Sequence, residues 1–308
     1  MKDLSIIKAD LMVFDEAHHV VGNEIQNLVF GSGIIAGKTL FTTATPKDDN
    51  GIEMTGEDGD CGPLVYEYTH RQAVEDGICN DIEIVVSTSP SSTSDNLSTR
   101  SILKAIVRNA LETRRNRVLA FHGLSEMEDL TGKRSNVVSF VKQAKKEIHK
   151  VLHDLVTTEF MDINPFQEVR VEGLTSSTKE RDLVIKEFEE CNDDCLFILS
   201  SCRIIGEGLD TKNANTLIFV DGKQSPTDII QNIGRVTRFN ERDPFSSILI
   251  PVAVNVSRYE EITDDSIQAK DRVLRESMGM EFQQILNVLG ALKPVSYTHL
   301  TLPTIYSV

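Results

Sequence analysis

The sequence predicts an α/β protein made of parallel sheets, with two domains along the chain. Short apolar strands alternate with helical segments over most of the sequence, as in parallel sheets whose faces are covered by helices. The chain has 308 residues, which is long enough for two domains with separate hydrophobic cores. Hydrophobic residues make up 40% of it and charged residues 26%, the proportions of a soluble globular protein.

The first expected domain, residues 1–75, begins with a strand that ends in acid. Ile6–Phe14 is an apolar run that leads straight into two carboxylates, which is typical of a buried strand that presents side chains at its carboxyl end. A β-rich run at residues 39–45, stopped by a proline, predicts a second strand, and residues 65–68 predict a short third one. A hinge expected near residues 71–81 closes this domain.

The second expected domain, residues 76–255, alternates strands and helices. Apolar β-rich runs predict strands at residues 82–87, 118–121, 168–173, 195–200, 216–220 and 247–254. Helical patterns lie between them at residues 100–117, 137–158, 178–190 and 227–238. We interpret the long helix at 137–158 as part of an insertion at about residues 125–160. A helical extension is expected at residues 256–293.

Charge and cysteine content narrow the function classes. The net charge of −15 argues against a broad basic face for nucleic acid, although it is compatible with a narrow cleft lined by local cations and backbone N–H groups. No stretch approaches the ~20 apolar residues of a membrane span and no signal peptide opens the chain, so we expect an intracellular protein, cytoplasmic or nuclear, without membrane contact. The five cysteines show no framework spacing and predict reduced thiols.

Two pairs of potential metal ligands stand out. Cys191 and Cys195 form a C-x3-C, and His149 and His153 lie four apart on a predicted helix. Neither pair has an evident third ligand, so a polar turn before a strand and a pair of surface histidines are preferred to zinc sites. The basic cluster Arg114–Arg117 is interpreted as a charge complement to a helix C-terminus rather than a binding patch.

The strongest chemical signal is DEAH, at residues 15–18, directly after the first strand. A carboxylate at the carboxyl end of a strand can hold Mg²⁺ beside a nucleotide, and its neighbour can orient the attacking water. Taken alone, an acidic turn after a buried strand is the simpler interpretation. Three further motifs follow in order, however: TATP at 43–46, IIGEGLD at 204–210 and QNIGRVTR at 231–238.

Taken together, the four motifs resemble superfamily two helicases and translocases of the DEAD/DEAH type, and they look closest to the branch of restriction-enzyme motor subunits and repair helicases. The resemblance covers roughly residues 1–255 and implies two RecA-like domains, the first incomplete, with ATP and Mg²⁺ as cofactors. It implies coupling of ATP hydrolysis to movement on nucleic acid, with DNA favoured over RNA. The alternative is a non-catalytic nucleic-acid- or protein-binding module that retains the second RecA-like domain.

The resemblance also implies roles for residues of the first domain. Asp15 would coordinate Mg²⁺ through water, and Glu16 would act as the general base for hydrolysis. His18 would couple the nucleotide site to the last motif, while Thr43 and Thr45 would link hydrolysis to movement between domains.

Residues of the second domain receive roles in the same way. Gln231 would sense the nucleotide, and Arg235 and Arg238 would reach the γ-phosphate across the cleft. Arg238 would be the arginine finger, which can contribute about 10³–10⁵ in rate. Because the two arginines lie three apart on a predicted helix, both can point at one ligand. The other expected contacts are with ribose and the nucleic-acid backbone at Gly208 and Asp210, and with nucleic acid at His122, Gly173 and Ser201.

Gly37-Lys38-Thr39 matches the end of a phosphate-binding loop, G-x-x-x-x-G-K-[ST], but we interpret the match as a coincidence. Ser32 stands where the first glycine is expected. A β-rich run follows the motif, whereas a phosphate loop must open into a helix whose N-terminus faces the phosphates. Lys38 is therefore expected to be the polar lead-in to the second strand.

Both ends of the chain differ from what the resemblance leads us to expect. The phosphate-binding loop of such helicases precedes the DEAH strand, and no G-K-[ST] precedes Asp15 here. We therefore expect that loop to lie in a segment upstream of Met1, and the chain alone to hydrolyse ATP poorly. Residues 294–308 contain VSYTHLTLPT, which resembles a translated sequencing adapter, and they are left out of the fold prediction.

Overall fold

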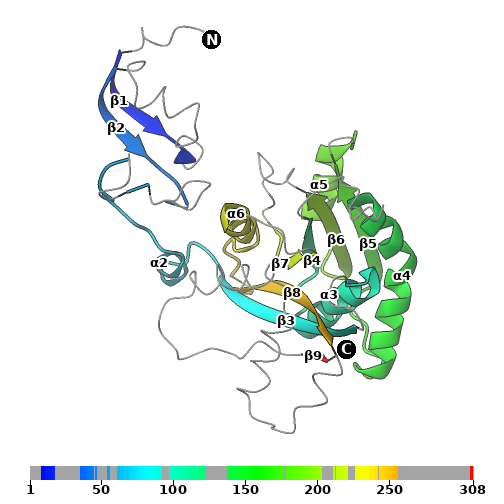
Figure 1. Cartoon of the computed structure of the whole chain (residues 1–308). Coiled ribbons are helices and arrows are strands. Elements are labelled where there is room, and N and C mark those ends of the chain that lie inside the picture. Colours follow the sequence, from blue (N-terminus) through cyan, green and yellow to red (C-terminus); the bar gives the residue numbers. More distant parts are fainter. Residues whose placement is uncertain are drawn as a thin grey trace. The chain divides into compact units, whose positions relative to one another are not determined.

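In the structure, a computed structural model, the chain divides into two compact units, Met1–Tyr68 and Thr69–Val308 (Figure 1). We expected the boundary after residue 75, which is where helix α2 (His70–Glu75) ends. The observed division, after Tyr68, lies seven residues earlier. The described residues are 8–17, 35–44, 46, 54–55, 61–91, 97–122, 137–175, 178–202, 211, 213–220, 226–241, 243–255 and 306–307. The expected helical extension at 256–293 lies outside them.

The first unit contains two parallel strands, β1 (Lys8–Phe14) and β2 (Ile35–Phe41). Phe14 lies opposite Phe41 in the register, and their rings stack with centroids 5.4 Å apart. Both strands therefore end at the same edge of the sheet. The predicted position of the second strand is wrong by four residues at each end, and the short strand predicted at residues 65–68 is not a strand.

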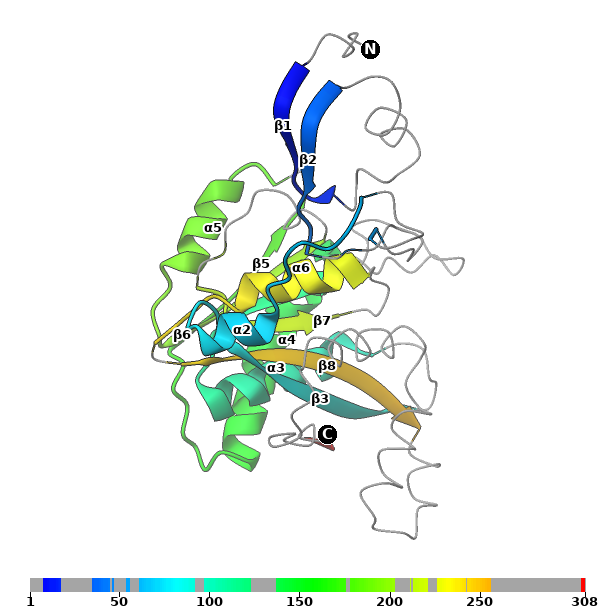
Figure 2. The ribbon, with the colours of Figure 1, turned by 90° about the vertical axis from the view of Figure 1, so that its left-hand side faces the viewer.

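The second unit is built on one parallel sheet, which confirms the predicted α/β class. Its strand order is β5-β6-β4-β7-β8-β3-β9, and every pair of neighbours is parallel. The strands are β3 (Asp81–Ser91), β4 (Arg117–His122), β5 (Glu168–Leu174), β6 (Cys195–Cys202), β7 (Thr216–Phe219), β8 (Phe245–Asn255) and β9 (Tyr306–Ser307). Strands β3 and β8 run side by side over eleven residue pairs (Figure 2).

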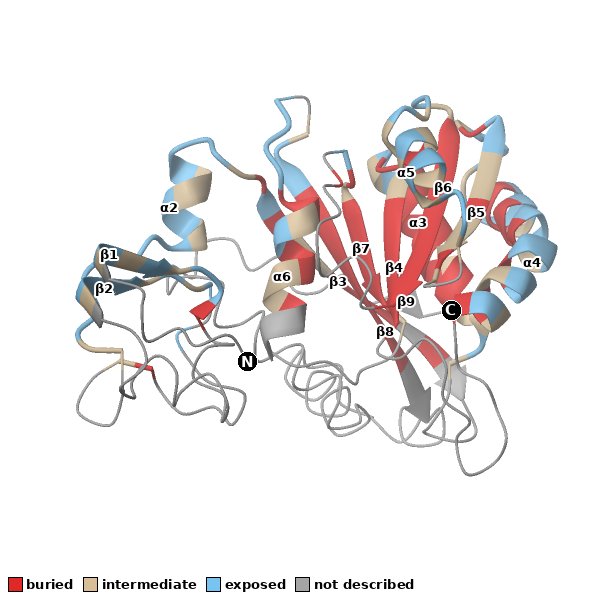
Figure 3. Ribbon diagram, turned by 90° about the horizontal axis from the view of Figure 1, so that it is seen from above, coloured by how far each residue is buried: buried red, intermediate tan, exposed pale blue. Residues whose placement is uncertain are grey.

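Helices cover both faces of this sheet, so its central strands are buried (Figure 3). In β6, Phe197 and Leu199 point into one core, while Leu196 and Ile198 point into the other. The first core includes residues of α5 (Arg181–Glu189) and α6 (Pro226–Val236), and the second those of α3 (Thr99–Thr113) and α4 (Val137–Thr158). This two-sided burial explains why the strands are continuous apolar runs rather than alternating ones. No helix in the described ranges is long and apolar enough to cross a membrane.

Helix α4 has the predicted bounds but is not an insertion. It follows β4 and precedes β5, and seven of its residues are buried in the core it shares with α3. A Cβ atom at Gly173 of β5 would lie 3.0 Å from Val137 and 3.1 Å from Val141, so α4 packs closely against that strand. The helix is therefore a crossover connection of the parallel sheet, as such strands require.

The basic cluster after α3 includes a buried structural arginine. The N-cap of α3 is Ser98, and its C-cap, Arg114, adopts the left-handed conformation. The guanidinium of Arg115 donates to Asp243 (2.6 Å), Glu83 (2.7 Å) and the Ser247 hydroxyl (2.7 Å). Burial opposes its charge, but the two carboxylates outweigh that effect and raise the pKa of Arg115. The arginine thus connects the end of α3 to β3 and β8. The sequence predicted only that the cluster complements the charge of the helix C-terminus, and did not predict this structural role.

Two residues of the segment left out of the fold prediction belong to the sheet. Tyr306 and Ser307 form β9, which pairs with Ser87 and Thr88 at the edge of β3. The rest of residues 256–308 lies outside the described part of the chain.

Candidate functional site

The acidic turn at the end of β1 is held to the end of β2. The Thr42 hydroxyl donates to Asp15 Oδ1 at 2.9 Å, and the Glu16 amide donates to the same oxygen at 3.0 Å. Backbone bonds from Thr42 N–H to Phe14 and from Ala17 N–H to Thr42, both 2.9 Å, extend the pairing beyond the strands. The turn is tight, since Glu16 has a φ of 49°. Both carboxyl side chains are nevertheless exposed.

This geometry suits a metal ion that is held partly by water. Mg²⁺ keeps several waters and usually takes one or two carboxylates together with substrate phosphates. Asp15 presents such a carboxylate in a fixed position. Among the described residues, no group of three or more His, Cys, Asp or Glu could enclose a metal. The residues present thus fit the predicted Mg²⁺ contact through water, and they do not form an all-protein metal cage.

Sequence reasoning missed Thr42. The prediction named Thr43 and Thr45, but Thr42 makes the described hydrogen bond to Asp15. Thr43 is half-buried in this turn, and Thr45 and His18 lie outside the described residues. The pairing of the two strands is the signal that points to Thr42. Because Phe14 lies opposite Phe41 in the parallel register, the residues that follow them, Asp15 and Thr42, lie next to each other.

The Gly37-Lys38-Thr39 motif lies inside β2, which confirms that it is not a phosphate-binding loop. A Cβ atom at Gly37 would lie 2.9 Å from the Asp10 carbonyl oxygen, so the glycine permits the close approach of β1 and β2. Lys38 and Thr39 pair with Leu11 and Met12 in mid-strand. Lys38 is therefore not the lead-in to the strand, because β2 begins three residues earlier.

Helix α6 and the turn after it carry the residues of the last motif. Ile229, Ile233 and Val236 of α6 are buried in the core, which fixes the helix on the sheet. Gln231 and Arg235 lie four apart on α6 and therefore share one face. Their side chains are half-buried.

Arg238 does not lie on the helix with Arg235. Helix α6 ends at Val236, and Arg238 forms an isolated antiparallel bridge with Cys79. The argument that both arginines point at one ligand because they are three apart on a helix is therefore wrong. Arg238 is presented by the turn that leads from α6 to β8, and its side chain is exposed.

The predicted nucleic-acid contacts of the second unit are largely buried. His122 and Ser201, at the carboxyl ends of β4 and β6, are 1% and 0% exposed. His122 Nε2 lies 2.8 Å from the Ser200 hydroxyl, and its ring packs against Phe140. Burial lowers the pKa of His122 to about 4, so the ring is neutral at pH 7. The predicted contact of His122 and Ser201 with nucleic acid is therefore corrected: both side chains belong to the interior, and direct contact with nucleic acid needs exposed atoms.

The other predicted contacts of this unit have different outcomes. Gly173 accommodates α4, which gives it a packing role whether or not its backbone also meets nucleic acid. Gly208 and Asp210 lie outside the described residues.

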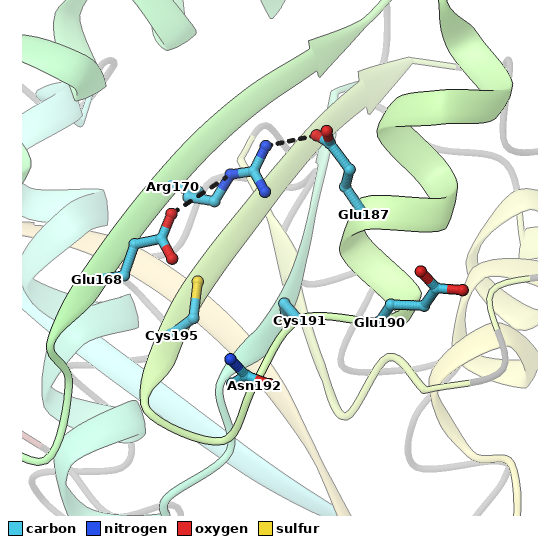
Figure 4. Close-up of a pocket in the computed structure, with 7 residues that line it drawn as sticks. All are labelled: Glu168, Arg170, Glu187, Glu190, Cys191, Asn192 and Cys195. Carbon is cyan, nitrogen blue, oxygen red and sulfur yellow. Dashed lines mark hydrogen bonds and ion pairs between the residues drawn. The ribbon is translucent and has the colours of Figure 1, made fainter.

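The two cysteines of the C-x3-C line a small hollow (Figure 4). The hollow measures about 250 Å³ and is lined by Glu168, Arg170, Glu187, Glu190, Cys191, Asn192 and Cys195. Arg170 pairs with both Glu187 and Glu168 there. Burial raises the pKa of Cys191 and raises that of Cys195 to about 12, so both are thiols at neutral pH. All five cysteines are free, as predicted.

Comparison with known proteins identifies relatives by sequence. Residues 109–240 match the helicase conserved C-terminal domain. A probable helicase of African swine fever virus (isolate Tick/South Africa/Pretoriuskop Pr4/1996) is 28% identical over 255 residues, which cover 80% of this chain and 26% of the viral protein. A probable ATP-dependent DNA helicase of Arabidopsis thaliana is 26% identical over 144 residues, 44% of this chain and 13% of the plant protein. The chain thus spans about a quarter of the viral relatives' length.

A solved structure shares the fold. An ATP-dependent type ISP restriction-modification enzyme bound to DNA matches with a TM-score of 0.61 and 17% identity, over 92% of this chain and 20% of that one. At this level of identity, the match shows a common fold.

Proposed function

We propose that the chain is part of an ATP-dependent helicase or translocase, because residues 109–240 match the helicase conserved C-terminal domain. The observation that carries the proposal is the acidic turn, in which Thr42, directly after the second strand, fixes Asp15 at the common edge of two parallel strands. Ligands of open α/β sheets bind outside the carboxyl ends of the strands, where this turn lies.

The proposed chemistry is phosphoryl transfer to water. Bound Mg²⁺ would neutralise charge on the phosphates of ATP, and Asp15 would hold it through water. Glu16, next in the turn, would accept the proton of the attacking water as the general base. Arg235 and Arg238 would stabilise charge on the γ-phosphate, and Gln231 would contact the nucleotide from the same face of α6 as Arg235.

The proposed partner is nucleic acid, and DNA is favoured. The Arabidopsis relative is described as a DNA helicase, and the enzyme with the same fold was solved bound to DNA. With a net charge of −15, the chain would contact the nucleic-acid backbone through a narrow track rather than a broad basic face.

We also propose that the phosphate-binding loop is supplied by a segment that precedes this chain. The G-K-T within β2 cannot serve, because it is a strand and no helix opens from it. The nucleotide sequence upstream of the Met1 codon tests this directly. An in-frame G-x-x-x-x-G-K-[ST] would support the motor, whereas a promoter and a genuine start codon would support the non-catalytic binding module.

ATP hydrolysis by the chain joined to that upstream segment, here called the extended chain, tests the reaction. Glu16→Gln should lower the hydrolysis rate by at least about 100-fold, since a general base contributes about 10²–10⁴-fold. Lys38→Ala is the matched control and should leave the rate unchanged, because Lys38 is an exposed mid-strand residue. The 308-residue chain alone should hydrolyse ATP poorly. Full activity in Glu16→Gln, or loss of activity in Lys38→Ala, would overturn the assignment.

A further inference from the structure

One buried asparagine holds both sides of the turn that presents Arg238. Asn80 is 3% exposed and directly precedes β3. Its backbone N–H donates to the Thr237 carbonyl at 2.7 Å, and its Oδ1 accepts from the Asn240 N–H at 2.9 Å. Arg238 lies between these two anchored residues.

A second arm of the same side chain reaches the end of helix α6. Asn80 Nδ2 donates to the Ser246 hydroxyl at 3.2 Å, and that hydroxyl donates to the Val236 carbonyl at 2.6 Å. The C-terminal carbonyls of a helix have no partner within the helix, so these bonds stabilise the end of α6. Asn80 and Ser246 thus fix where the helix stops and where the turn begins.

The support behind Asn80 is rigid. The next residue, Asp81, opens β3, which pairs with β8 along eleven residues. Cys79, on the other side, forms the bridge with Arg238, and its N–H donates to Ala73 of α2 at 3.3 Å. The turn is therefore attached to the strand on one side of Asn80 and to α2 on the other.

We propose that Asn80 is a positioning residue for Arg238, an inference that rests on the proposed role of Arg238 at the γ-phosphate. Asn80 contacts the backbone of residues 237 and 240 and so sets where the exposed arginine side chain begins. Catalytic groups must be held within about 0.5 Å of the productive geometry, and a 1 Å misplacement can cost about 100-fold in rate. A residue buried in the core thereby determines how well an arginine at the surface can act.

Amide hydrogen exchange in the 308-residue chain tests the structural half of this inference. Asn80→Ala should speed exchange of the amides at residues 238–241 by about five- to tenfold, the equivalent of one lost hydrogen bond. Asn116→Ala is the matched control, because Asn116 is equally buried and donates to Asn192 and Cys195, away from this turn. If exchange at 238–241 rises no more in Asn80→Ala than in Asn116→Ala, the inference is wrong.

ATP hydrolysis by the extended chain tests the functional half. Asn80→Ala should lower kcat by about ten- to 100-fold with KM for ATP within about twofold, as expected when a group that acts in the transition state is misplaced. In an Arg238→Ala background, adding Asn80→Ala should lower kcat by less than about twofold more, because Asn80 acts through Arg238. Unchanged kcat in Asn80→Ala, with a loss in Arg238→Ala, would overturn the inference and leave the proposed function intact.

Two further results separate the remaining cases. If the extended chain hydrolyses no ATP, the proposed function fails, and the exchange measurement still decides whether Asn80 fixes the turn. If Asn80→Ala does not fold, Asn240→Pro removes the same hydrogen bond from an exposed residue. Exchange at residues 238 and 239 should then rise as predicted for Asn80→Ala, and unchanged exchange there would contradict the inference.

Discussion

The stability of the second unit depends on pH through His122, which lies at the buried end of β4. Its ring is 1% exposed, and burial lowers its pKa to about 4 from an ordinary value of 6.5. Among the described residues, Nδ1 has no hydrogen-bond partner, so a proton added there would be buried without an acceptor. The folded protein therefore resists protonation of this ring, whereas the unfolded chain accepts it readily.

The magnitude follows from the two pKa values. Between pH 6.5 and 4 the unfolded state binds more protons than the folded state, so stability falls as the pH falls through this window. The neutral ring's full contribution is present above pH 6.5. At pH 5, the difference between pKa 6.5 and about 4 corresponds to a loss of about 2 kcal/mol in the free energy of unfolding relative to pH 7.

Urea unfolding of the 308-residue chain at pH 7 and pH 5 measures this loss. His122→Gln is the comparison, because glutamine can still hydrogen-bond Ser200 but does not titrate. The wild-type protein should lose about 2 kcal/mol more than His122→Gln between the two pH values, while all other titrating groups contribute equally to both. Equal losses in the two proteins would refute burial of His122 and restore it as a candidate surface contact.

Two further predictions concern packing. Arg115→Met should lower the free energy of unfolding by about 3 kcal/mol, the low end for a broken buried ion pair, because Asp243 and Glu83 keep some contact with water. Lys145→Met is the control, because it removes an exposed ion pair worth about 0–1 kcal/mol. A loss in Lys145→Met equal to the loss in Arg115→Met would contradict the stabilising role of the buried Arg115 ion pairs. Gly37→Ala should destabilise the protein by about 1–3 kcal/mol, since its Cβ meets a backbone oxygen at 2.9 Å. Gly234→Ala enters open space on α6 and should stabilise by up to about 1 kcal/mol, so melting temperatures that shift in the same direction would be a contrary result.

Much of the second unit could be predicted because its strands and helices have strong local patterns. The bounds of α4, Val137–Thr158, were predicted correctly, since apolar residues recur at helical spacing along it. Its role was not, because the sequence does not show which strands a helix connects. Burial of His122 could not be predicted for the same reason. It follows from the position of β4 as a central strand with neighbours on both sides, and strand order is a property of the whole sheet.

The first unit was harder to predict from local propensity. The β-branched run at residues 39–45 favoured a strand there, whereas the structure has β2 at Ile35–Phe41. The strand includes glycine and lysine, which have low strand propensity, and its position depends on pairing with β1. Pairing between distant segments thus overrides the local preference.

The end of α6 shows how a long-range contact limits prediction at the site. The sequence pattern continued the helix through Arg238, but it stops at Val236. Asn80, more than 150 residues earlier, binds the carbonyl of Thr237 and the amide of Asn240. No local pattern reveals this contact, although it decides how Arg238 is presented.

The most direct test of the motor is stimulation of ATP hydrolysis by nucleic acid in the extended chain. Hydrolysis should rise when duplex DNA is added, and Arg238→Ala should abolish the stimulated rate, since an arginine finger contributes about 10³–10⁵ in rate. A rate that does not respond to DNA or RNA, or a stimulated rate that survives in Arg238→Ala, would contradict the proposal that this chain couples ATP hydrolysis to movement on nucleic acid.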